Sequence, residues 1–103
     1  MRKRDLLLHP TTTTDLNVGH DIGWFIADED AADGYTWCFT GDDSGLYELV
    51  DNFTVYPPAI SRHAGKHIFK IKGIKSGDAA AHFDLVRGGE NPRESVTVTL
   101  HVV

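Results

Sequence analysis

The sequence has little cysteine and no long apolar segment, and both shortages exclude classes of protein. Among its 103 residues there is one cysteine, Cys38, so the sequence supports neither an internal disulfide nor a cysteine-based metal cluster. No apolar run approaches the ~20 residues of a membrane helix, and we expect no membrane partner. The basic opening of the chain is followed by only three apolar residues, which is too few for a signal peptide. We therefore expect a cytoplasmic protein, with export from a longer precursor as the alternative.

Positive charge is absent from the middle of the chain. Residues 20–51 carry nine carboxylates and no lysine or arginine, whereas residues 52–103 carry seven basic and four acidic side chains. The formal net charge is −5, and without a long basic stripe we expect no nucleic-acid partner. The hydrophobic content of 41% is enough for a core, so the composition is not that of a disordered chain. The length indicates a single domain.

Hydrophobic and polar residues alternate along most of the chain, which is the pattern of β-strands. The clearest case is residues 96–103, where apolar side chains occupy one face and Thr97, Thr99 and His101 occupy the other. No segment of ten residues shows a helical period without a turn residue that interrupts it. We predict strands at residues 12–18, 21–27, 35–39, 46–50, 53–56, 67–72, 79–87 and 95–103.

Seven or eight short strands separated by turn residues predict an all-β fold, an immunoglobulin-like antiparallel β-sandwich. We expect residues 1–11 to form an N-terminal tail and residues 12–103 to form a single domain. Alternate connections of such a sandwich fall at the same end. The connections 28–34, 57–66 and 88–94 should therefore cluster, and binding residues tend to lie on such loops.

Two acidic clusters allow more than one interpretation. The first cluster consists of Asp28, Glu29, Asp30 and Asp33. It fits either a calcium site or, as we favour, a solvated loop with a binding role. The second, Asp42-Asp43-Ser44, is typical of a hairpin turn.

The six histidines raise the question of a zinc site. His63 and His67 are four residues apart, and we expect His82 and His101 to lie near one another on adjacent strands. Because carboxylates in the right frame are missing, we favour ordinary surface histidines. We expect no metal and no cofactor.

Residues 21–27 place Ile22, Trp24 and Ile26 on one face of a strand. We expect Trp24 and Trp37 to form the central pair of the core rather than a platform for a ligand. Cys38 follows Trp37 directly, and we expect it to be a small packed residue rather than a nucleophile. No Ser-His-Asp or Cys-His arrangement stands out, so an enzyme is the least favoured interpretation.

Residues 30–37 read Asp-Ala-Ala-Asp-Gly-Tyr-Thr-Trp and resemble the Asn-Pro-Thr-Thr-Gly-Tyr-x-Trp loop and strand of the chagasin family of cysteine protease inhibitors. Residues 18–21 resemble the family's Val-Gly-Asp-type entry to the second strand, and residues 65–79 resemble its glycine-rich loop, strand and glycine turn. Arg87 matches the first residue of the family's Arg-Pro-Trp loop, in which Gly88 and Gly89 replace the other two. The resemblance covers residues 15–103.

The resemblance implies a monomeric, reversible and non-covalent inhibitor whose three loops occlude the active-site cleft of a papain-like cysteine protease. It places Gly65 and Lys66 at the tip of the middle loop. The residues that it assigns to protease binding are Asp30, Ala31, Ala32, Asp33, Gly34, Ala64, Gly65, Lys66, Arg87, Gly88 and Gly89.

Two points about this end of the molecule stay open. The two neighbouring loops carry the basic residues Arg62, Lys66, Arg87 and Arg93. These residues either form a rim beside the acidic loop or are ordinary surface charge. The altered loop residues also leave an alternative function, that of an immunoglobulin-like interaction module that has lost protease inhibition.

Overall fold

The computed structural model describes residues 4–30, 33–56 and 64–103, and most of them lie in β-strands. In chain order the strands are β1 (Arg4–Leu7), β2 (Thr14–Leu16), β3 (Asp21–Asp30), β4 (Thr36–Thr40), β5 (Tyr47–Val55), β6 (Ala64–Gly73), β7 (Gly77–Val86) and β8 (Glu94–Val102). The predicted all-β class is confirmed. The described residues contain no helix that is long and apolar enough to cross a membrane.

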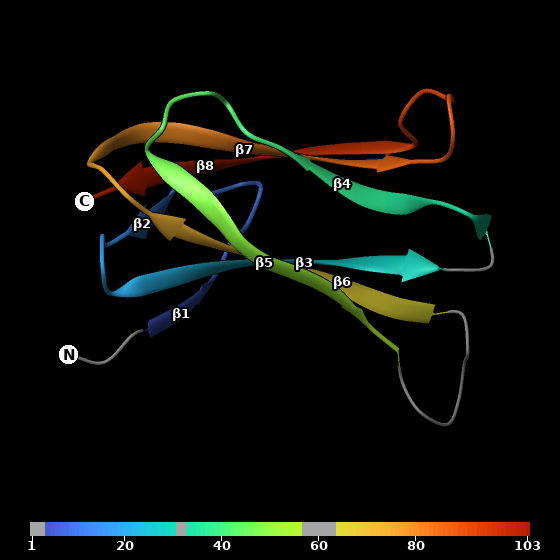
Figure 1. The fold of residues 1–103 in the computed structure, drawn as a ribbon, viewed down its shortest axis with the longest axis horizontal. Coiled ribbons are helices and arrows are strands. Elements are labelled where there is room, and N and C mark those ends of the chain that lie inside the picture. The colour runs from blue at the N-terminus through green and yellow to red at the C-terminus, as the bar shows by residue number, and fades with distance from the viewer. Residues whose placement is uncertain (1–3, 31–32, 57–63) are drawn as a thin grey trace.

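The strands form two four-stranded sheets that pack face to face (Figure 1). Sheet A has the order β1-β3-β6-β5, and sheet B has the order β2-β8-β7-β4. The predicted sandwich is therefore confirmed, but it is not purely antiparallel. The edge strands β1 and β2 run parallel to β3 and β8, whereas the remaining pairs are antiparallel.

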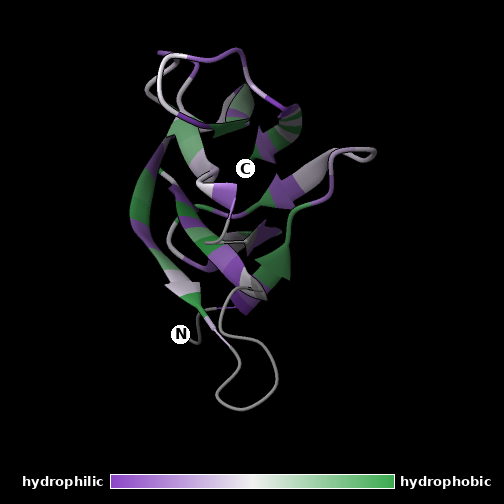
Figure 2. Cartoon of the chain, turned by 90° about the vertical axis from the view of Figure 1, so that its right-hand side faces the viewer, coloured by the Kyte–Doolittle hydropathy of each residue, from purple (hydrophilic) through white to green (hydrophobic). Residues whose placement is uncertain are grey.

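The core lies between the sheets, and sheet B supplies it as the period of two predicts. Strands β7 and β8 bury alternate side chains, namely Ala79, Ala81, Phe83, Leu85, Val98, Leu100 and Val102. Figure 2 shows hydrophobic and hydrophilic bands that alternate along the strands. From this layer the ring of Phe83 stacks on Phe25 of sheet A, with 4.0 Å between the ring centroids.

Strand β3 buries the face opposite to the one that we predicted. Phe25 is 5% exposed and contacts Trp37 edge-on at 5.9 Å, while Trp24 is partly exposed on the outer face and Ile26 is 41% exposed. The predicted pair of Trp24 with Trp37 is therefore wrong. The inner face includes Gly23, where an added Cβ would lie 2.9 Å from the buried side chain of Leu8. Because Leu8 fills that space, glycine suits this inward position, and the same parity turns Phe25 inward and Trp24 outward.

The outer face of sheet A holds Trp24 in a polar and cationic setting. The indole N–H of Trp24 donates to the carboxylate of Asp5 at 3.0 Å, and the Lys70 ammonium lies 4.2 Å from the centre of the ring. The register also aligns Ile26 with Ile68 of β6, so apolar side chains extend across neighbouring strands of this face.

Two segments pair differently from the prediction. Residues 1–11, which we expected to form a tail, include β1, and β1 pairs with β3 at the edge of sheet A. The predicted strands 46–50 and 53–56 form the single strand β5, whose pairing with β6 shifts between Leu49 and Asp51. This β-bulge interrupts the alternation, which explains why the sequence indicates two strands.

The predictions for Cys38 and for the following turn are also wrong. Cys38 is exposed, because Trp37 takes the inward position on β4. The turn after β4 leads from sheet B to sheet A, so it is not a hairpin. Its Asp42 carboxylate accepts hydrogen bonds from the N–H of Ser44 at 3.0 Å and from the N–H of Ala80 at 2.8 Å, which fixes the crossover against β7.

The two tryptophans should therefore differ in their effect on stability. We predict that Trp37→Ala lowers the free energy of unfolding by about 3–5 kcal/mol, because it removes a buried ring. Trp24→Ala should lower it by only about 1 kcal/mol, because it removes a surface cation–π contact and one exposed hydrogen bond. Urea denaturation followed by circular dichroism measures both values. Equal losses would contradict the outward position of Trp24.

Candidate functional site

Three connections leave the sandwich at the same end, as we predicted (Figure 1). The register places the ends of β3 and β5 beside the start of β6, and the starts of β4 and β8 beside the end of β7. The first loop is residues 31–35, the middle loop is residues 56–63 and the third loop is residues 87–93. Residues 31–32 and 57–63 lie outside the described residues, so the site is described from the bases of these loops.

The first loop turns sharply at Asp33 and Gly34. The Asp33 Oδ1 atom accepts a hydrogen bond from the N–H of Tyr35 at 2.9 Å, as aspartates in turns commonly do. Gly34 has a φ of 78°, and an added Cβ there would lie 3.3 Å from the side chain of Arg87. Glycine suits both the left-handed backbone and the close approach. The predicted binding residues before this turn are Asp30, Ala31 and Ala32. Ala31, Ala32 and the side chain of Asp30 lie outside the described part of the structure.

Two arginines fasten the third loop to the first. Arg87 Nη1 donates to the backbone carbonyl of Asp33 at 3.1 Å, and Arg93 Nη1 donates to Asp33 Oδ2 at 3.2 Å. The guanidinium carbons of Arg87 and Arg93 lie 4.7 and 5.3 Å from the centre of the Tyr35 ring, within cation–π range. We call Asp33, Tyr35, Arg87 and Arg93 the arginine clamp. It joins two loops that are more than fifty residues apart in the sequence.

The tip of the third loop is open although its base is held. Arg87 also donates to both carboxylate oxygens of Glu90, at 2.6 and 3.2 Å, and the N–H of Glu90 returns to the Arg87 carbonyl at 3.1 Å. Gly88 has a φ of 53°, and an added Cβ at Gly88 or Gly89 would meet no atom within 4 Å. The loop therefore has a closed base and two exposed glycines at its tip.

Gly65 and Lys66 lie within β6, so they are not at the tip of the middle loop as we expected. An added Cβ at Gly65 would lie 2.7 Å from the Tyr56 ring and 2.9 Å from the Val55 carbonyl. Glycine therefore lets β5 and β6 approach closely at the base of the loop. Lys66 forms an ion pair with Asp28 of β3. The neighbouring Ala64 is the first residue of β6, and Arg62 lies outside the described residues.

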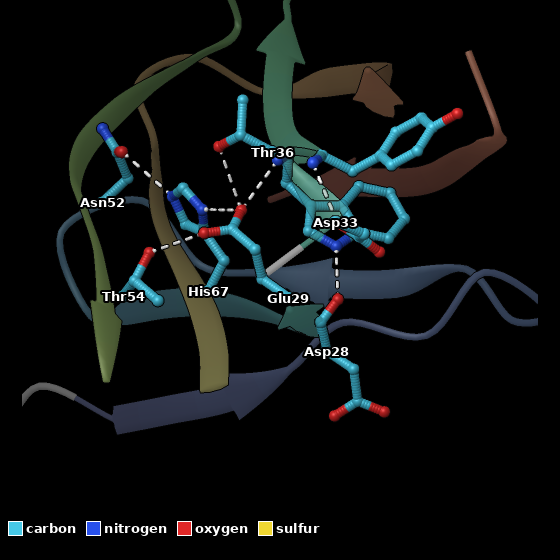
Figure 3. Close-up of polar contacts among 9 residues, drawn as sticks. Asp28, Glu29, Asp33, Thr36, Asn52, Thr54 and His67 are labelled. Carbon is cyan, nitrogen blue, oxygen red and sulfur yellow. Dashed lines mark hydrogen bonds and ion pairs between the residues drawn. The ribbon is translucent and has the colours of Figure 1, made fainter. Parts of the chain in front are cut away.

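Glu29 is buried, with 7% of the residue exposed. Its carboxylate lies among polar groups at the bases of the first and middle loops (Figure 3). Its Oε2 atom accepts hydrogen bonds from the Trp37 N–H at 2.8 Å, the Thr36 hydroxyl at 3.1 Å and His67 Nδ1 at 2.9 Å. Its Oε1 atom accepts from the Thr54 hydroxyl at 3.0 Å. Burial alone raises the pKa of Glu29, but these hydrogen bonds, that of His67 first, hold the pKa below the ordinary value of 4.5.

His67 is buried with Glu29, which corrects our interpretations of both residues. The imidazole ring stacks on Phe69 with 4.3 Å between ring centroids, and Nε2 lies 3.2 Å from Asn52 Oδ1. Glu29 is thus not part of a solvated loop, and His67 is not a surface histidine. The alternation contains the signal that we missed, because Glu29 has the inward parity of Phe25 and His67 has that of Phe69.

The other candidate ligands do not converge. Within the described residues, no group of three or more histidine, cysteine, aspartate or glutamate side chains is placed to hold a metal ion. The predicted proximity of His82 and His101 is wrong, because the register pairs His82 with Thr97 and His101 with Asp78. Their ring nitrogens contact those partners at 3.0 and 2.7 Å. His63 lies outside the described residues.

The basic side chains of this end lie against its acidic segment. Lys66 meets Asp28, while Arg87 and Arg93 both meet Asp33. Of the two alternatives, the described residues therefore favour a basic rim beside the acidic segment. A cavity of about 590 Å³ opens beneath these groups between β3 and β8. Its lining includes aromatic and charged side chains, among them Phe25, Trp37, Tyr35, Asp33, Arg93 and Glu94.

Comparisons with known proteins show the family and the fold of the chain. The family model described as chagasin family peptidase inhibitor I42 matches residues 26–102. The chain is also similar to the structure of the cysteine protease inhibitor EhICP2 from Entamoeba histolytica, with a TM-score of 0.75 and 15% identity. That alignment covers 100% of this chain and 97% of the other. No curated protein sequence matches this chain.

Two further solved structures share the fold. Amebosin aligns with a TM-score of 0.59 and 23% identity, over 99% of this chain and 97% of that chain. PbICP-C, solved in complex with falcipain-2, aligns with a TM-score of 0.62 and 15% identity, over 99% of this chain and 90% of that chain. At these identities the structural similarities show a common fold.

The buried Glu29 carboxylate predicts a loss of stability in acid. Because its pKa in the folded protein lies below 4.5, its contribution is complete above that value and disappears as the pH falls through the folded pKa. At neutral pH, Glu29→Gln should lower the free energy of unfolding by about 1–3 kcal/mol, because three buried donors exchange a charged acceptor for a neutral one. Urea denaturation of both proteins at several pH values should show this difference shrinking as the pH falls. A difference that is independent of pH would contradict the prediction.

Proposed function

The chain belongs to the chagasin family of peptidase inhibitors, and on this basis we propose that it is a reversible, non-covalent inhibitor of papain-family cysteine proteases. The observation that carries the proposal is the contact between residues of the two matching motifs. Asp33 and Gly34 of the first loop meet Arg87 of the third loop, although these segments are distant in the sequence. The relative PbICP-C, which was solved with falcipain-2, supports a protease as the partner.

The proposed mechanism is occlusion of the active-site cleft by the three loops. Papain-type proteases hold a thiolate and an imidazolium, and a loop that fills the space beside this pair excludes the substrate without any covalent step. The rigid sandwich presents the loop bases, and the arginine clamp joins two of them before binding. Loops that are held in advance lose less conformational entropy when they bind, which increases affinity.

Asp33 stands where the family has a threonine, and its charge is compensated within the inhibitor. Oδ1 accepts from the Tyr35 N–H, and Oδ2 accepts from Arg93. An uncompensated carboxylate near the protease thiolate would be repelled, and its desolvation would be costly. We therefore assign Asp33 the role of shaping the loop that enters the cleft, with Arg93 as its counter-ion.

Gly88 and Gly89 favour the alternative function, an interaction module without protease inhibition. They replace the proline and tryptophan of the family motif, and the φ of 53° at Gly88 is one that proline cannot adopt. Aromatic residues are frequent anchors of protein interfaces, and the loss of one commonly costs about 2 kcal/mol or more of binding free energy. Whether the protein is an inhibitor or an interaction module then depends on whether the contacts of the other loop residues are sufficient for protease inhibition.

Inhibition assays test the proposal directly. We expect the protein to inhibit papain or a cathepsin L-like enzyme reversibly in a peptide-hydrolysis assay. Arg87→Ala should weaken inhibition about tenfold or more, because it opens the clamp. Asp33→Asn keeps the Oδ1 acceptor for Tyr35 and should weaken inhibition less than Asp33→Ala.

Lys72→Ala is the matched control for these variants, because it removes the surface ion pair between Lys72 of β6 and Glu48 of β5, at the end away from the loops. It should leave inhibition unchanged. The absence of inhibition by micromolar wild-type protein across a panel of papain-like enzymes would overturn the proposal and favour the interaction module.

Gly89→Trp supplies the missing aromatic residue. It tests the proposed inhibitory function by a gain of inhibition, whereas the variants above test it by a loss. An added Cβ at Gly89 meets nothing within 4 Å, so we expect the variant to fold with the stability of the wild type. If the third loop enters the cleft, the indole should tighten inhibition about tenfold or more, measured as a lower inhibition constant. An unchanged inhibition constant would contradict the placement of the third loop against the protease.

A further inference from the structure

Both ends of the first loop and both ends of the middle loop contact one carboxylate. Glu29 precedes the first loop, and Thr36 and Trp37 follow it; Thr54 precedes the middle loop, and His67 follows it. All four partners bind the Glu29 carboxylate at 2.8–3.1 Å (Figure 3). One buried side chain therefore joins strands β3, β4, β5 and β6, and both sheets, directly beneath two loops.

The arrangement depends on an ionised carboxylate at position 29. The Oε2 atom accepts three hydrogen bonds, and two of their donors, the Trp37 N–H and the Thr36 hydroxyl, come from the sheet opposite to β3. A glutamine has the same shape but turns one of the two acceptors into an N–H₂ donor. The Thr54 hydroxyl can reverse to accept from that N–H₂ group, but the three donors at the Oε2 site then bind a neutral amide oxygen in place of a charged one. Hydrogen bonds to a charged acceptor are the stronger kind, so the connection between the strands weakens.

The network links the two sheets at the end that carries the loops. Strands β3 and β4 belong to different sheets, and the first loop spans the gap between them. The Trp37 indole N–H adds a second connection by donating to the Asp28 carbonyl at 2.8 Å. The spacing of the two sheets at this end sets how far the β4 end of the first loop lies from its β3 end and from the base of the middle loop, which are in sheet A. An inhibitor that inserts several loops into one cleft requires this spacing to match the cleft.

We propose that Glu29 is a positioning residue, which sets the relative placement of the first and middle loops and thereby the affinity for the protease. It does so without touching the protease, because it is only 7% exposed and lies under the loop bases. The inference rests on the proposed inhibitory function, and it adds a requirement that the loop motifs do not contain. Preorganisation of the loops is the physical source of the effect.

Asp21 offers a matched control on the same strand. It is 3% exposed and opens β3 at the end opposite to the loops. Its carboxylate accepts hydrogen bonds from the backbone and side chain of Asn17, both at 2.8 Å, and from Arg4 at 3.2 and 3.3 Å. Asp21→Asn therefore disrupts a buried carboxylate of comparable burial and bonding without altering the loop bases.

The experiment compares inhibition by the wild type, Glu29→Gln and Asp21→Asn against papain, with each concentration corrected for the folded fraction. We expect Glu29→Gln to raise the inhibition constant about tenfold or more, and Asp21→Asn to change it less than about twofold. Amide hydrogen exchange of Tyr35 and Lys66, neither of which bonds to Glu29 through its amide, should be faster in Glu29→Gln than in Asp21→Asn. A contribution to global stability alone would affect exchange and inhibition equally in both variants.

Thr54→Val provides a second variant in case Glu29→Gln does not fold. It removes only the hydroxyl that binds Oε1 and keeps the shape of the side chain, and we expect it to weaken inhibition about fivefold.

The outcomes separate the two proposals. If the wild type inhibits papain and the Glu29 and Thr54 variants behave like Asp21→Asn, the positioning role is overturned and the proposed function stands. If the wild type inhibits no papain-like enzyme, the proposed function fails, and hydrogen exchange decides the inference. Faster exchange of Tyr35 and Lys66 in Glu29→Gln than in Asp21→Asn then supports the positioning of the loops, and equal exchange overturns it.

Discussion

The sandwich depends on the packing of Phe83 against aromatic rings of the opposite sheet. Phe83 is fully buried in sheet B, and its ring stacks on Phe25 at 4.0 Å and lies 5.1 Å from Phe69, both of sheet A. Burial of a side chain of this size contributes about 1.5–3 kcal/mol, and the contact also fixes the distance between the sheets. Phe25 in turn contacts Trp37 at 5.9 Å, so aromatic packing continues from the centre of the molecule to the end that carries the loops.

The apolar core ends at Trp37, and polar interactions hold the structure beyond it. Between the sheets, the Glu29 carboxylate accepts hydrogen bonds from three other strands. On the surface, Arg87 and Arg93 contact Asp33 and the Tyr35 ring. The buried carboxylate is tolerated because several donors converge on it, and the exposed clamp gains from the planar, multidentate guanidinium groups. The bases of the loops are thus held by contacts within the chain, and the proposed inhibitory function would use them in this form.

Much of this architecture was predictable from local patterns. Strands β7 and β8 have most of their apolar residues on one face, so the period of two identifies their inward residues. The resemblance in residues 30–37 and at Arg87 located the loops that cluster at one end. The alternation on β3 was ambiguous, since Trp24 and Phe25 lie on opposite faces and both faces are apolar. There the side chain of Leu8, from a segment that we had expected to be a tail, decides which face is inward.

The sequence by itself determined the class of fold, the family and the end of the molecule at which the loops meet. These follow from the period-two alternation, turn residues and short motifs, which are local properties of the chain. Only the tertiary structure decided the roles of Glu29, His67 and Asp33. In the sequence, a glutamate next to aspartates is typical of a solvated loop. Its burial depends on donors from strands up to 38 residues away in the chain. The physical reason is that an ionised side chain can be buried only where several donors converge, and convergence is a property of the fold.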